Sequence, residues 1–321
     1  MLAVSLLVFD GIVPSSVTGV VDLLAGANKY LEAAGKPPGF SVELVGEHPP
    51  MMAFPQAPYK PFAGAAEPDL VIIPSFMVDN PSILADNGAM IGWIKATRAD
   101  GAEMASLCAG CYFLAEAGLL DGKEVTSHWA VLADMQQRYP TLKLKSDRVI
   151  TDQDGIYTSG GAFSSLKLVL YLIEKFCGRE TALWVSKMFA IDLDRGNHAH
   201  FAVFTGQHGH GDSGILEAQA YLEKHYTDEI SLEHLSTHVN MGKRNFIRRF
   251  KAATNNTPFE YLQRVRIESA KKAIETNDRD LTNIMDDAGY RDPKTFRTIF
   301  KRITGLSPME YKRKYARRYT E

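Results

Sequence analysis

Apolar positions in the first 195 residues fall into two alternating patterns. Short apolar runs predict buried β-strands, and the stretches between and after them have the 3.6-residue spacing of amphipathic helices. The clearest strands are residues 4–9, 69–74, 103–108 and 125–128, and the clearest helices are residues 17–31 and 163–176. This alternation predicts an α/β fold with a parallel sheet flanked by helices on both faces. Ligands of such sheets bind outside the C-terminal ends of the strands.

The last hundred residues contain one pattern twice. The matching positions are Phe246, Phe250, Lys251, Thr254, Pro258, Glu260 and Tyr261, which recur fifty residues later as Phe296, Phe300, Lys301, Thr304, Pro308, Glu310 and Tyr311. Upstream the offset is 49, which pairs Ser231 with Asp280. A doubled unit of this length predicts one supersecondary element used twice.

Each copy has the pattern of a helix, a short turn and a second helix. Ser231 and Asp280 are predicted to cap the first helices. The second helices are predicted over residues 243–254 and 293–304, and a long helix over residues 258–276 joins the two copies. Within each second helix, two phenylalanines four positions apart share the inward face, so the basic side chains point outward.

Charge is distributed unevenly along the chain. Residues 213–321 hold 21 Lys/Arg and 15 Asp/Glu, a net charge of +6, whereas residues 1–212 hold 15 and 23, a net charge of −8. The two second helices contain nine Lys/Arg and no acid. A single basic helix is usually only a solvated face. Two duplicated basic helices instead favour a nucleic-acid partner, since phosphates and guanine acceptors attract Lys and Arg.

Residues 230–312 resemble the DNA-binding domain of AraC/XylS-type transcription regulators. The second copy carries the family signature Phe296-x3-Phe300-Lys301-x3-Gly305-x2-Pro308-x2-Tyr311. The resemblance implies an all-α domain with two helix-turn-helix units whose second helices enter successive major grooves of double-stranded DNA. Two positions depart from the family pattern, Met285 in place of Ala and Asn240 in place of Gly.

The DNA-binding residues expected by position lie on the two second helices. Those carried over as base-facing are Arg244, Ile247 and Arg248 in the first unit, and Lys294, Arg297 and Thr298 in the second. Lys243, Lys251 and Lys301 complete the predicted contact surface.

Cys108 follows an apolar strand and has only small residues beside it. The run Ser106-Leu107-Cys108-Ala109-Gly110 has the composition of a nucleophile elbow, whose central residue takes strained backbone angles. His128 ends another strand and could approach this thiol. Cys108 could equally be a small core residue, or form a redox pair with Cys111. His128 could be a hydrogen-bonded interior histidine.

The N-terminal part resembles the ThiJ/PfpI group of the class I glutamine-amidotransferase-like superfamily, which implies a flavodoxin-like sandwich. The matching segments are Asp10-Gly11, the Cys108 turn and residues 115–122 and 126–129. The last two are particularly similar to the GlxA-type regulators, which join this domain to an AraC-type one. Catalytic members of the group present a carboxylate where this chain has Ser16, and hydrolytic relatives often have a histidine where it has Ala109. The usual Gly-rich oxyanion loop is replaced by Pro74-Ser75-Phe76.

These departures favour a former active site that is retained to bind a small molecule. The predicted ligand-binding residues are Asp10, Gly11, Phe76, Cys108, Ala109 and His128, with no catalytic residue, metal or cofactor. Relatives in the group sense betaines, carnitine or arginine, and the sequence does not choose among them. The alternative is a cysteine-dependent hydrolase or lyase of the ThiJ/PfpI group with a DNA-binding tail. A third is a constitutive DNA-binding protein whose body only dimerises.

Glycines and histidines gather between the two parts of the chain. His198, His200, His208 and His210 form two H-x-H pairs that could bind a metal, although a solvated linker is the favoured interpretation. The predicted organisation is a sensing and dimerisation domain over residues 1–195, a linker over 196–213 and a DNA-binding domain over 214–321.

Together these features predict a transcription regulator controlled by a small metabolite, and not an enzyme. The expected partners are promoter DNA, a small-molecule effector and a second copy of the chain, with RNA polymerase as a possible further partner and no membrane. Three cysteines without a paired framework fit the reducing cytoplasm.

Overall fold

The computed structural model describes residues 1–50, 53–80, 82–192, 199–276 and 279–316. The chain divides into two compact units, Met1–His198 and Ala199–Glu321. Each unit is described by itself.

The N-terminal unit is built on a seven-stranded sheet in the order β3-β2-β1-β4-β5-β9-β8. All neighbouring strands run parallel except β8 and β9, which are antiparallel. The strands are β1 (Leu2–Leu7), β2 (Phe40–Gly46), β3 (Tyr59–Pro61), β4 (Leu70–Ile73), β5 (Glu103–Ser106), β8 (Ile150–Gln153) and β9 (Ile156–Ser159). Because β2 and β4 both pair with β1, the order of connection reverses beside β1, where such sheets bind ligands.

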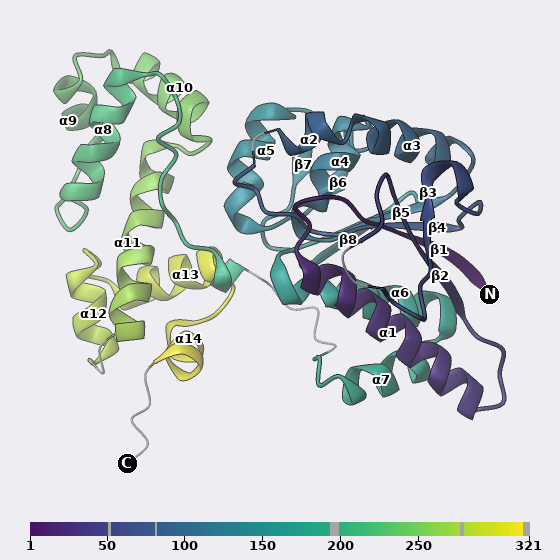
Figure 1. Ribbon diagram of the computed structural model, residues 1–321. Helices are drawn as coiled ribbons and strands as arrows, with labels where there is room; N and C mark the ends of the chain where they lie inside the picture. Colours follow the sequence, from purple (N-terminus) through teal and green to yellow (C-terminus); the bar gives the residue numbers. More distant parts are fainter. Residues whose placement is uncertain (51–52, 81, 193–198, 277–278, 317–321) are drawn as a thin grey trace. The chain divides into compact units, whose positions relative to one another are not determined.

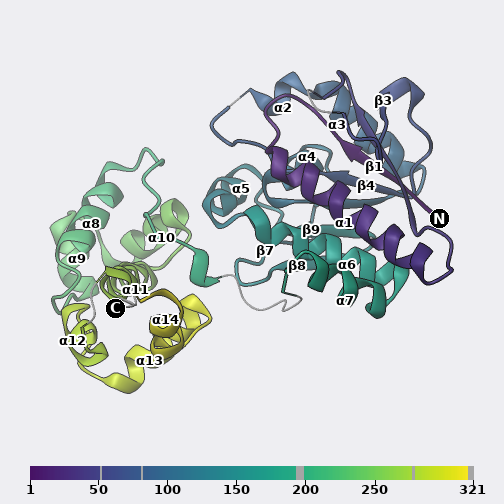
Figure 2. The ribbon, with the colours of Figure 1, turned by 60° about the horizontal axis from the view of Figure 1, so that its bottom comes forward.

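Helices cover both faces of this sheet (Figure 1, Figure 2). One face carries α1 (Pro14–Ala33), α6 (Leu166–Cys177) and α7 (Arg179–Met188), and the other carries α2 (Ile83–Asp86), α3 (Gly88–Ala99), α4 (Cys111–Glu116) and α5 (Leu132–Arg138). Alternate side chains of β4 enter the two cores: Leu70 and Ile72 pack under α1 and α6, and Val71 and Ile73 pack under α3 and α4. The predicted α/β class with helices on both faces is confirmed.

Several short elements complete the N-terminal unit. They are the 3-10 turns η1 (Phe62–Gly64), η2 (Cys108–Gly110), η3 (Trp129–Val131) and η4 (Ala162–Ser165), and the strands β6 (Glu124–Val125) and β7 (Lys143–Leu144). β6 and β7 form a separate two-stranded sheet, so the predicted strand at residues 125–128 does not belong to the main sheet. In the part of the chain that the structure describes, no helix is long and apolar enough to cross a membrane.

The C-terminal unit is helical and has two cores along one long helix, α11 (Pro258–Thr276) (Figure 1). The other elements are η5 (Ala199–Phe201), α8 (Ser213–Lys224), α9 (Leu232–His238), α10 (Lys243–Thr254), α12 (Leu281–Asp287), α13 (Pro293–Thr304) and α14 (Pro308–Tyr315). The first core joins α8, α9 and α10 to the start of α11, and the second joins α12, α13 and α14 to its end. The predicted all-α domain with two helix-turn-helix units is confirmed.

The duplication extends to hydrogen bonds. The Tyr261 hydroxyl donates to Glu223 Oε1, and the Tyr311 hydroxyl donates to Glu275 Oε1. Ser307 and Glu310 form a capping box at the start of α14, and Thr257 and Glu260 exchange the equivalent bonds before α11. Each pair satisfies backbone N–H groups that a helix start leaves without partners.

The two departures from the family pattern are accommodated locally. Asn240 takes a left-handed backbone with φ 52°, and its counterpart Gly289 has φ 79°. Asn enters this region more readily than most residues, so both turns keep the same backbone class. Met285 is buried in the second core.

Candidate functional site

The turn before α10 orients the first basic helix. Ser231 caps α9 as predicted, because its side chain accepts a hydrogen bond from the backbone N–H of His234. Phe246 and Phe250 are fully buried against α8 and α9. Packing of these two rings leaves the opposite face of α10 in solvent. The predicted residues Lys243, Arg244, Arg248 and Lys251 are exposed on it, and Ile247 is half-buried.

The second basic helix, α13, is oriented in the same way. Asp280 caps α12, and Asp292 caps α13 by accepting from the N–H of Thr295. Phe296 and Phe300 are buried in the second core. The four predicted residues of this helix, Lys294, Arg297, Thr298 and Lys301, are exposed.

Most of the exposed cations on these two helices have no acidic partner. Lys243 pairs with Glu233 at 3.3 Å. The Arg248 guanidinium donates to the Asn245 side-chain oxygen at 2.9 Å, which leaves its charge uncompensated. Within the described residues, no ion pair involves any of the other seven exposed cations: Arg244, Arg248, Lys251, Lys294, Arg297, Lys301 and Arg302. Such a surface can bind phosphates without first breaking internal pairs.

Sequence reasoning missed one basic residue of α10. Arg249 donates two hydrogen bonds to the Asp212 carboxylate, at 2.8 and 2.7 Å. This guanidinium lowers the pKa of Asp212. Asp212 also caps α8 by accepting from the N–H of Ile215. An acid directly before an apolar-periodic run is an N-cap signal in the sequence, but the arginine it binds lies 37 residues away.

Cys108 occupies a left-handed turn at the end of β5. Its φ is 54°, and its side chain is buried in the core beneath α3 and α4. Gly110 is required two residues later, since a Cβ there would lie 2.6 Å from the Ile73 carbonyl oxygen. The strained turn predicted by the small neighbours is therefore present. The thiol also packs as a core side chain, as the alternative interpretation expected.

His128 lies half-buried after β6, and its ring rests against Gly161. A Cβ on Gly161 would lie 1.8 Å from the imidazole Cδ2. Nδ1 of His128 accepts a hydrogen bond from the N–H of Ala130 at 3.2 Å. Burial lowers its pKa, which favours the neutral ring with its proton on Nε2. In the described residues, no hydrogen bond joins His128 to the Cys108 thiol.

The loops after β1 and β4 close on one another at the C-terminal edge of the sheet. Ile12 and Phe76 form a β-bridge, and the N–H of Val13 donates to the Ser75 carbonyl at 2.8 Å. Phe76 is 5% exposed and packs edge-on against Phe113, with ring centroids 5.4 Å apart. Of the predicted ligand residues here, Asp10 and Gly11 are exposed, whereas Phe76 and Ala109 are buried.

A cavity of about 190 Å³ opens beside this edge. Phe76 and Ala130 bring two of the loops to its wall, and α4 and α5 contribute Tyr112, Asp134 and Arg138. Asp134 accepts a hydrogen bond from the Tyr112 hydroxyl at 2.6 Å and pairs with Arg138 at 2.8 Å. Cys108 is not among the residues that line it.

Comparison with protein families matches both units. The DJ-1/PfpI family model matches residues 3–175, more than half of the chain. The chain belongs to the DJ-1/PfpI family. A helix-turn-helix domain model matches residues 235–314, which cover the second core and most of the first. The two resemblances predicted from the sequence, ThiJ/PfpI-like followed by AraC-type, are confirmed.

Curated relatives of this DJ-1/PfpI member include helix-turn-helix-type transcriptional regulators from Pseudomonas aeruginosa. GbdR is 25% identical over 221 residues, 68% of this chain and 60% of GbdR. ArgR is 25% identical over 236 residues, 73% of this chain and 71% of ArgR. The chain thus spans about 60% of the length of GbdR. Among solved structures, an AraC family transcriptional regulator from Pseudomonas putida is 18% identical with a TM-score of 0.49, covering 59% of this chain and all of that one.

Ser16 has a structural role where catalytic relatives in the DJ-1/PfpI family present a carboxylate. It is buried, and its hydroxyl donates to the Val13 carbonyl at 2.6 Å. The same oxygen accepts from the N–H of Ser75 at 3.1 Å. Ser16 therefore ties the start of α1 to the loop after β4. No acid at this position faces Cys108.

Cys111, one turn beyond Cys108, should be chemically protected. Burial raises the pKa of its thiol to about 12, and Sγ lies 3.0 Å from Ser127 Oγ. At pH 8 we expect native Cys111 to react with iodoacetamide roughly a thousandfold more slowly than in the urea-unfolded chain, since only the thiolate attacks. Peptide mass mapping measures both rates. Equal rates in the folded and unfolded chains would contradict the burial of this thiol.

Proposed function

We propose that the protein is a sequence-specific DNA-binding transcription regulator controlled by a small metabolite. The DNA-binding part of this proposal rests on the duplicated helices α10 and α13, which expose seven cations that form no ion pair within the described residues. Buried phenylalanines fix the outward face of each helix, so the two units present equivalent surfaces. The named function of the regulators to which the chain is similar supports the same conclusion.

In this proposal each of α10 and α13 enters a major groove, as second helices of helix-turn-helix units do. The side chains near the start and middle of the helices read bases: Arg244, Ile247 and Arg248 from one unit, and Lys294, Arg297 and Thr298 from the other. Arg and Lys suit guanine acceptors, whereas Ile247 and the methyl group of Thr298 suit the methyl group of thymine. Lys243, Lys251 and Lys301 bind phosphates.

Replacing Arg248 by Ala should weaken specific binding by about 1–3 kcal/mol, as expected for one lost base contact. The probe is a duplex selected from a random-sequence pool with the wild-type full-length chain, and fluorescence anisotropy gives the Kd. Arg179→Ala is a matched control, because Arg179 is equally a surface arginine but lies on α7 and pairs with Glu174. Unchanged affinity of Arg248→Ala would remove this residue from the reading surface.

The proposed metabolite site lies where the loops after β1, β4, β5 and β6 gather at one edge of the sheet. A left-handed backbone at a non-glycine residue is costly and is typically retained for function, which supports a role for the Cys108 turn. The cavity of about 190 Å³ beside Phe76 and Ala130 supplies room for a small molecule against mixed apolar and polar walls. Asp10, Gly11, Cys108, Ala109 and His128 do not line this cavity, and they enter the proposed site on the resemblance.

We propose binding without turnover, because Ser16 is engaged in bonds to the backbone and His128 makes no hydrogen bond to Cys108. The full-length chain should show no turnover of amides or α-oxo aldehydes, and a compound from a panel of small amino and betaine-like acids should raise its Tm. Turnover that Cys108→Ser abolishes would establish the cysteine-dependent hydrolase or lyase instead. No thermal shift with any compound would favour the third hypothesis, a constitutive DNA-binding protein whose N-terminal unit only dimerises. Homodimerisation through this unit and RNA polymerase as a further partner are parts of the proposal that rest on the resemblance. A cytoplasmic location is also proposed and rests on the cysteine content.

A further inference from the structure

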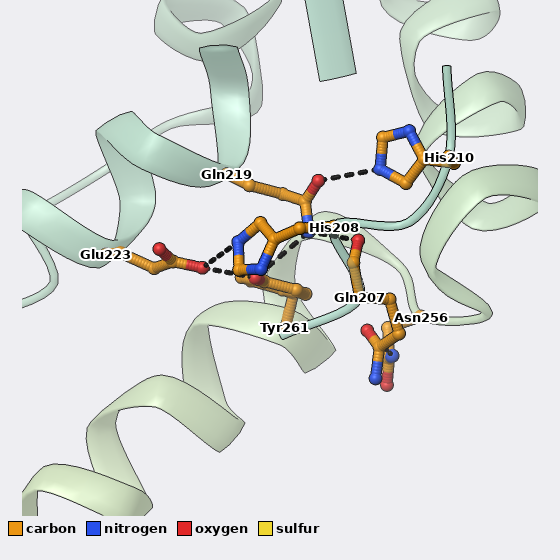
Figure 3. Close-up of polar contacts among 7 residues, drawn as sticks. All are labelled: Gln207, His208, His210, Gln219, Glu223, Asn256 and Tyr261. Carbon is orange, nitrogen blue, oxygen red and sulfur yellow. Dashed lines mark hydrogen bonds and ion pairs between the residues drawn. The ribbon is translucent and has the colours of Figure 1, made fainter. Parts of the chain in front are cut away.

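The segment that leads into the helical unit packs against it over most of its length. We call residues 199–212 the strap. His208 and His210, expected to lie in a solvated linker, instead make hydrogen bonds to α8 (Figure 3). His198 lies outside the described residues. No group of three or more His, Cys, Asp or Glu side chains suited to a metal ion occurs in the described part of the chain.

The strap begins against the second helix-turn-helix unit. η5 lies beside α13, and His200 Nε2 is 3.0 Å from Lys314 Nζ on α14. Lys271 on α11 donates to the Ala202 carbonyl at 2.5 Å, and its buried partner Glu268 accepts from the N–H of Phe204 at 3.1 Å. An ion pair on the shared helix therefore binds the first half of the strap.

The middle of the strap is bound to the first unit by a network whose donors and acceptors are matched (Figure 3). The amide nitrogen of the fully buried Gln219 donates to the Gln207 carbonyl at 2.9 Å and to the Tyr261 hydroxyl at 3.0 Å. Its amide oxygen lies 2.8 Å from His210 Nε2. The Tyr261 hydroxyl donates to Glu223, which also contacts His208 Nε2 at 3.0 Å. A buried network of this kind favours one arrangement, since moving the strap would remove Gln207 and His210 and leave Gln219 with Tyr261 alone of these three partners.

Gly206 is required where the strap crosses Tyr261. It has φ 74°, and a Cβ there would lie 2.4 Å from the tyrosine oxygen and 2.6 Å from the His208 ring. By contrast, Gly209 has nothing within 4 Å of the equivalent position, and its φ is not positive. The strap thus contains one glycine that its docking depends on, Gly206, and two that it does not depend on, Gly209 and Gly211.

The strap ends beside α10. We call α10 and α13, the helices proposed to enter the major grooves, the recognition helices. Asp212 caps α8 and binds Arg249 on α10 with two hydrogen bonds. The same segment therefore touches α13 through η5 and α10 through Asp212. It is also the part of the helical unit that is next in sequence to the DJ-1/PfpI unit.

We infer that the docked strap positions the two recognition helices, α10 and α13, for DNA. Asp212 and Arg249 act as positioning residues: they hold α10 against α8 and leave the base-facing side chains free. When the strap is released, the helices must be ordered at the moment of binding, which costs affinity. This inference rests on the proposed DNA-binding function.

The test compares two identical substitutions in the full-length chain. Gly206→Ala should release the second half of the strap, which contacts α8 and α10, whereas Gly209→Ala should leave it docked. We expect amide exchange in α8 and α10 to rise only in Gly206→Ala, and its affinity for the selected duplex to fall about tenfold, within the usual range of coupling between sites. Hydroxyl-radical footprints should lose protection mainly over the half contacted by α10. A general loss of stability would instead reduce the footprint protection equally over both halves of the DNA site.

Asp212→Asn provides a second test if Gly206→Ala unfolds the helical unit. Asn caps helices as well as Asp does, so α8 should persist while the ion pair with Arg249 is lost. We expect severalfold weaker binding and the same one-sided footprint. Wild-type affinity and footprints in both Gly206→Ala and Asp212→Asn would overturn the inference and leave the proposed function standing. A wild-type chain that selects no duplex would overturn both.

Discussion

Phe300→Ala is expected to destabilise the helical unit by about 3–5 kcal/mol and to abolish binding by the second helix-turn-helix unit. Phe300 is fully buried, and its ring packs edge-on against Phe296 and Tyr311, with centroids 5.5 and 5.4 Å away. Removing it leaves a cavity beneath the helix that presents Lys294 and Arg297. A loss of this size is a large share of the ~5–15 kcal/mol that holds a typical domain folded.

Denaturant unfolding of the full-length chain measures this effect. Circular dichroism follows the helices of both units, and tryptophan fluorescence follows the N-terminal unit alone, so a circular-dichroism transition that shifts without the fluorescence transition reports the helical unit. The three tryptophans, Trp93, Trp129 and Trp184, all lie in the N-terminal unit, so the fluorescence transition should not move. Phe259→Ala is the control, because this ring on α11 is 46% exposed. A shift below about 1 kcal/mol for Phe300→Ala would contradict the observed core, since a phenylalanine truncated in a packed interior costs more.

The helical unit could be predicted to the residue at several places. The helices expected over residues 243–254, 258–276 and 293–304 have those bounds in the structure. Local signals mark their ends: Pro258 and Pro293 start helices, and Asn255 and Gly305 end them in left-handed conformations. Because the unit is duplicated, these helix-start and helix-end signals occur at equivalent positions in both copies.

The sheet was predicted less completely, for a physical reason. Strands buried on both faces are continuous apolar runs without alternation, so their ends are not marked. The strand expected at residues 4–9 is β1 at Leu2–Leu7, and β2, β3, β8 and β9 were not predicted. The order of the strands in the sheet depends on pairings between residues far apart in sequence, such as Val4 of β1 with Leu70 of β4.

The candidate DNA-binding surface could likewise be predicted more completely than the candidate ligand site or the strap. Outward positions on an amphipathic helix follow from its period, so the exposure of Arg244, Arg248, Lys294 and Arg297 was predictable. The packing of Phe76 among the rings of the core, the bonds of Ser16 and the docking of the strap each depend on partners 37 or more residues away or on several elements at once. Glycines and histidines in a row resemble a solvated linker unless those partners are known.

Binding to the selected duplex should fall about fortyfold between 50 and 200 mM monovalent salt. Each phosphate neutralised by Lys or Arg contributes ~0.9 to the slope of log Kd against log salt concentration, and the proposed function assigns three lysines to phosphates, namely Lys243, Lys251 and Lys301. A slope near three is the expected result. A flat profile would show that these side chains do not displace counterions.

Substitutions of single lysines locate this salt dependence on the surface. Lys251→Gln and Lys301→Gln occupy equivalent positions in the two units, and each should reduce the slope by about one. Lys29→Gln makes the same change of charge on an exposed residue of α1 and should leave the slope unchanged. Equal reductions from Lys251 and Lys301 would mean that both units bind phosphate in the same way, as the duplicated caps and cores require. A reduction from only one would show that a single unit anchors the complex, and it would confine the proposed base contacts to that unit.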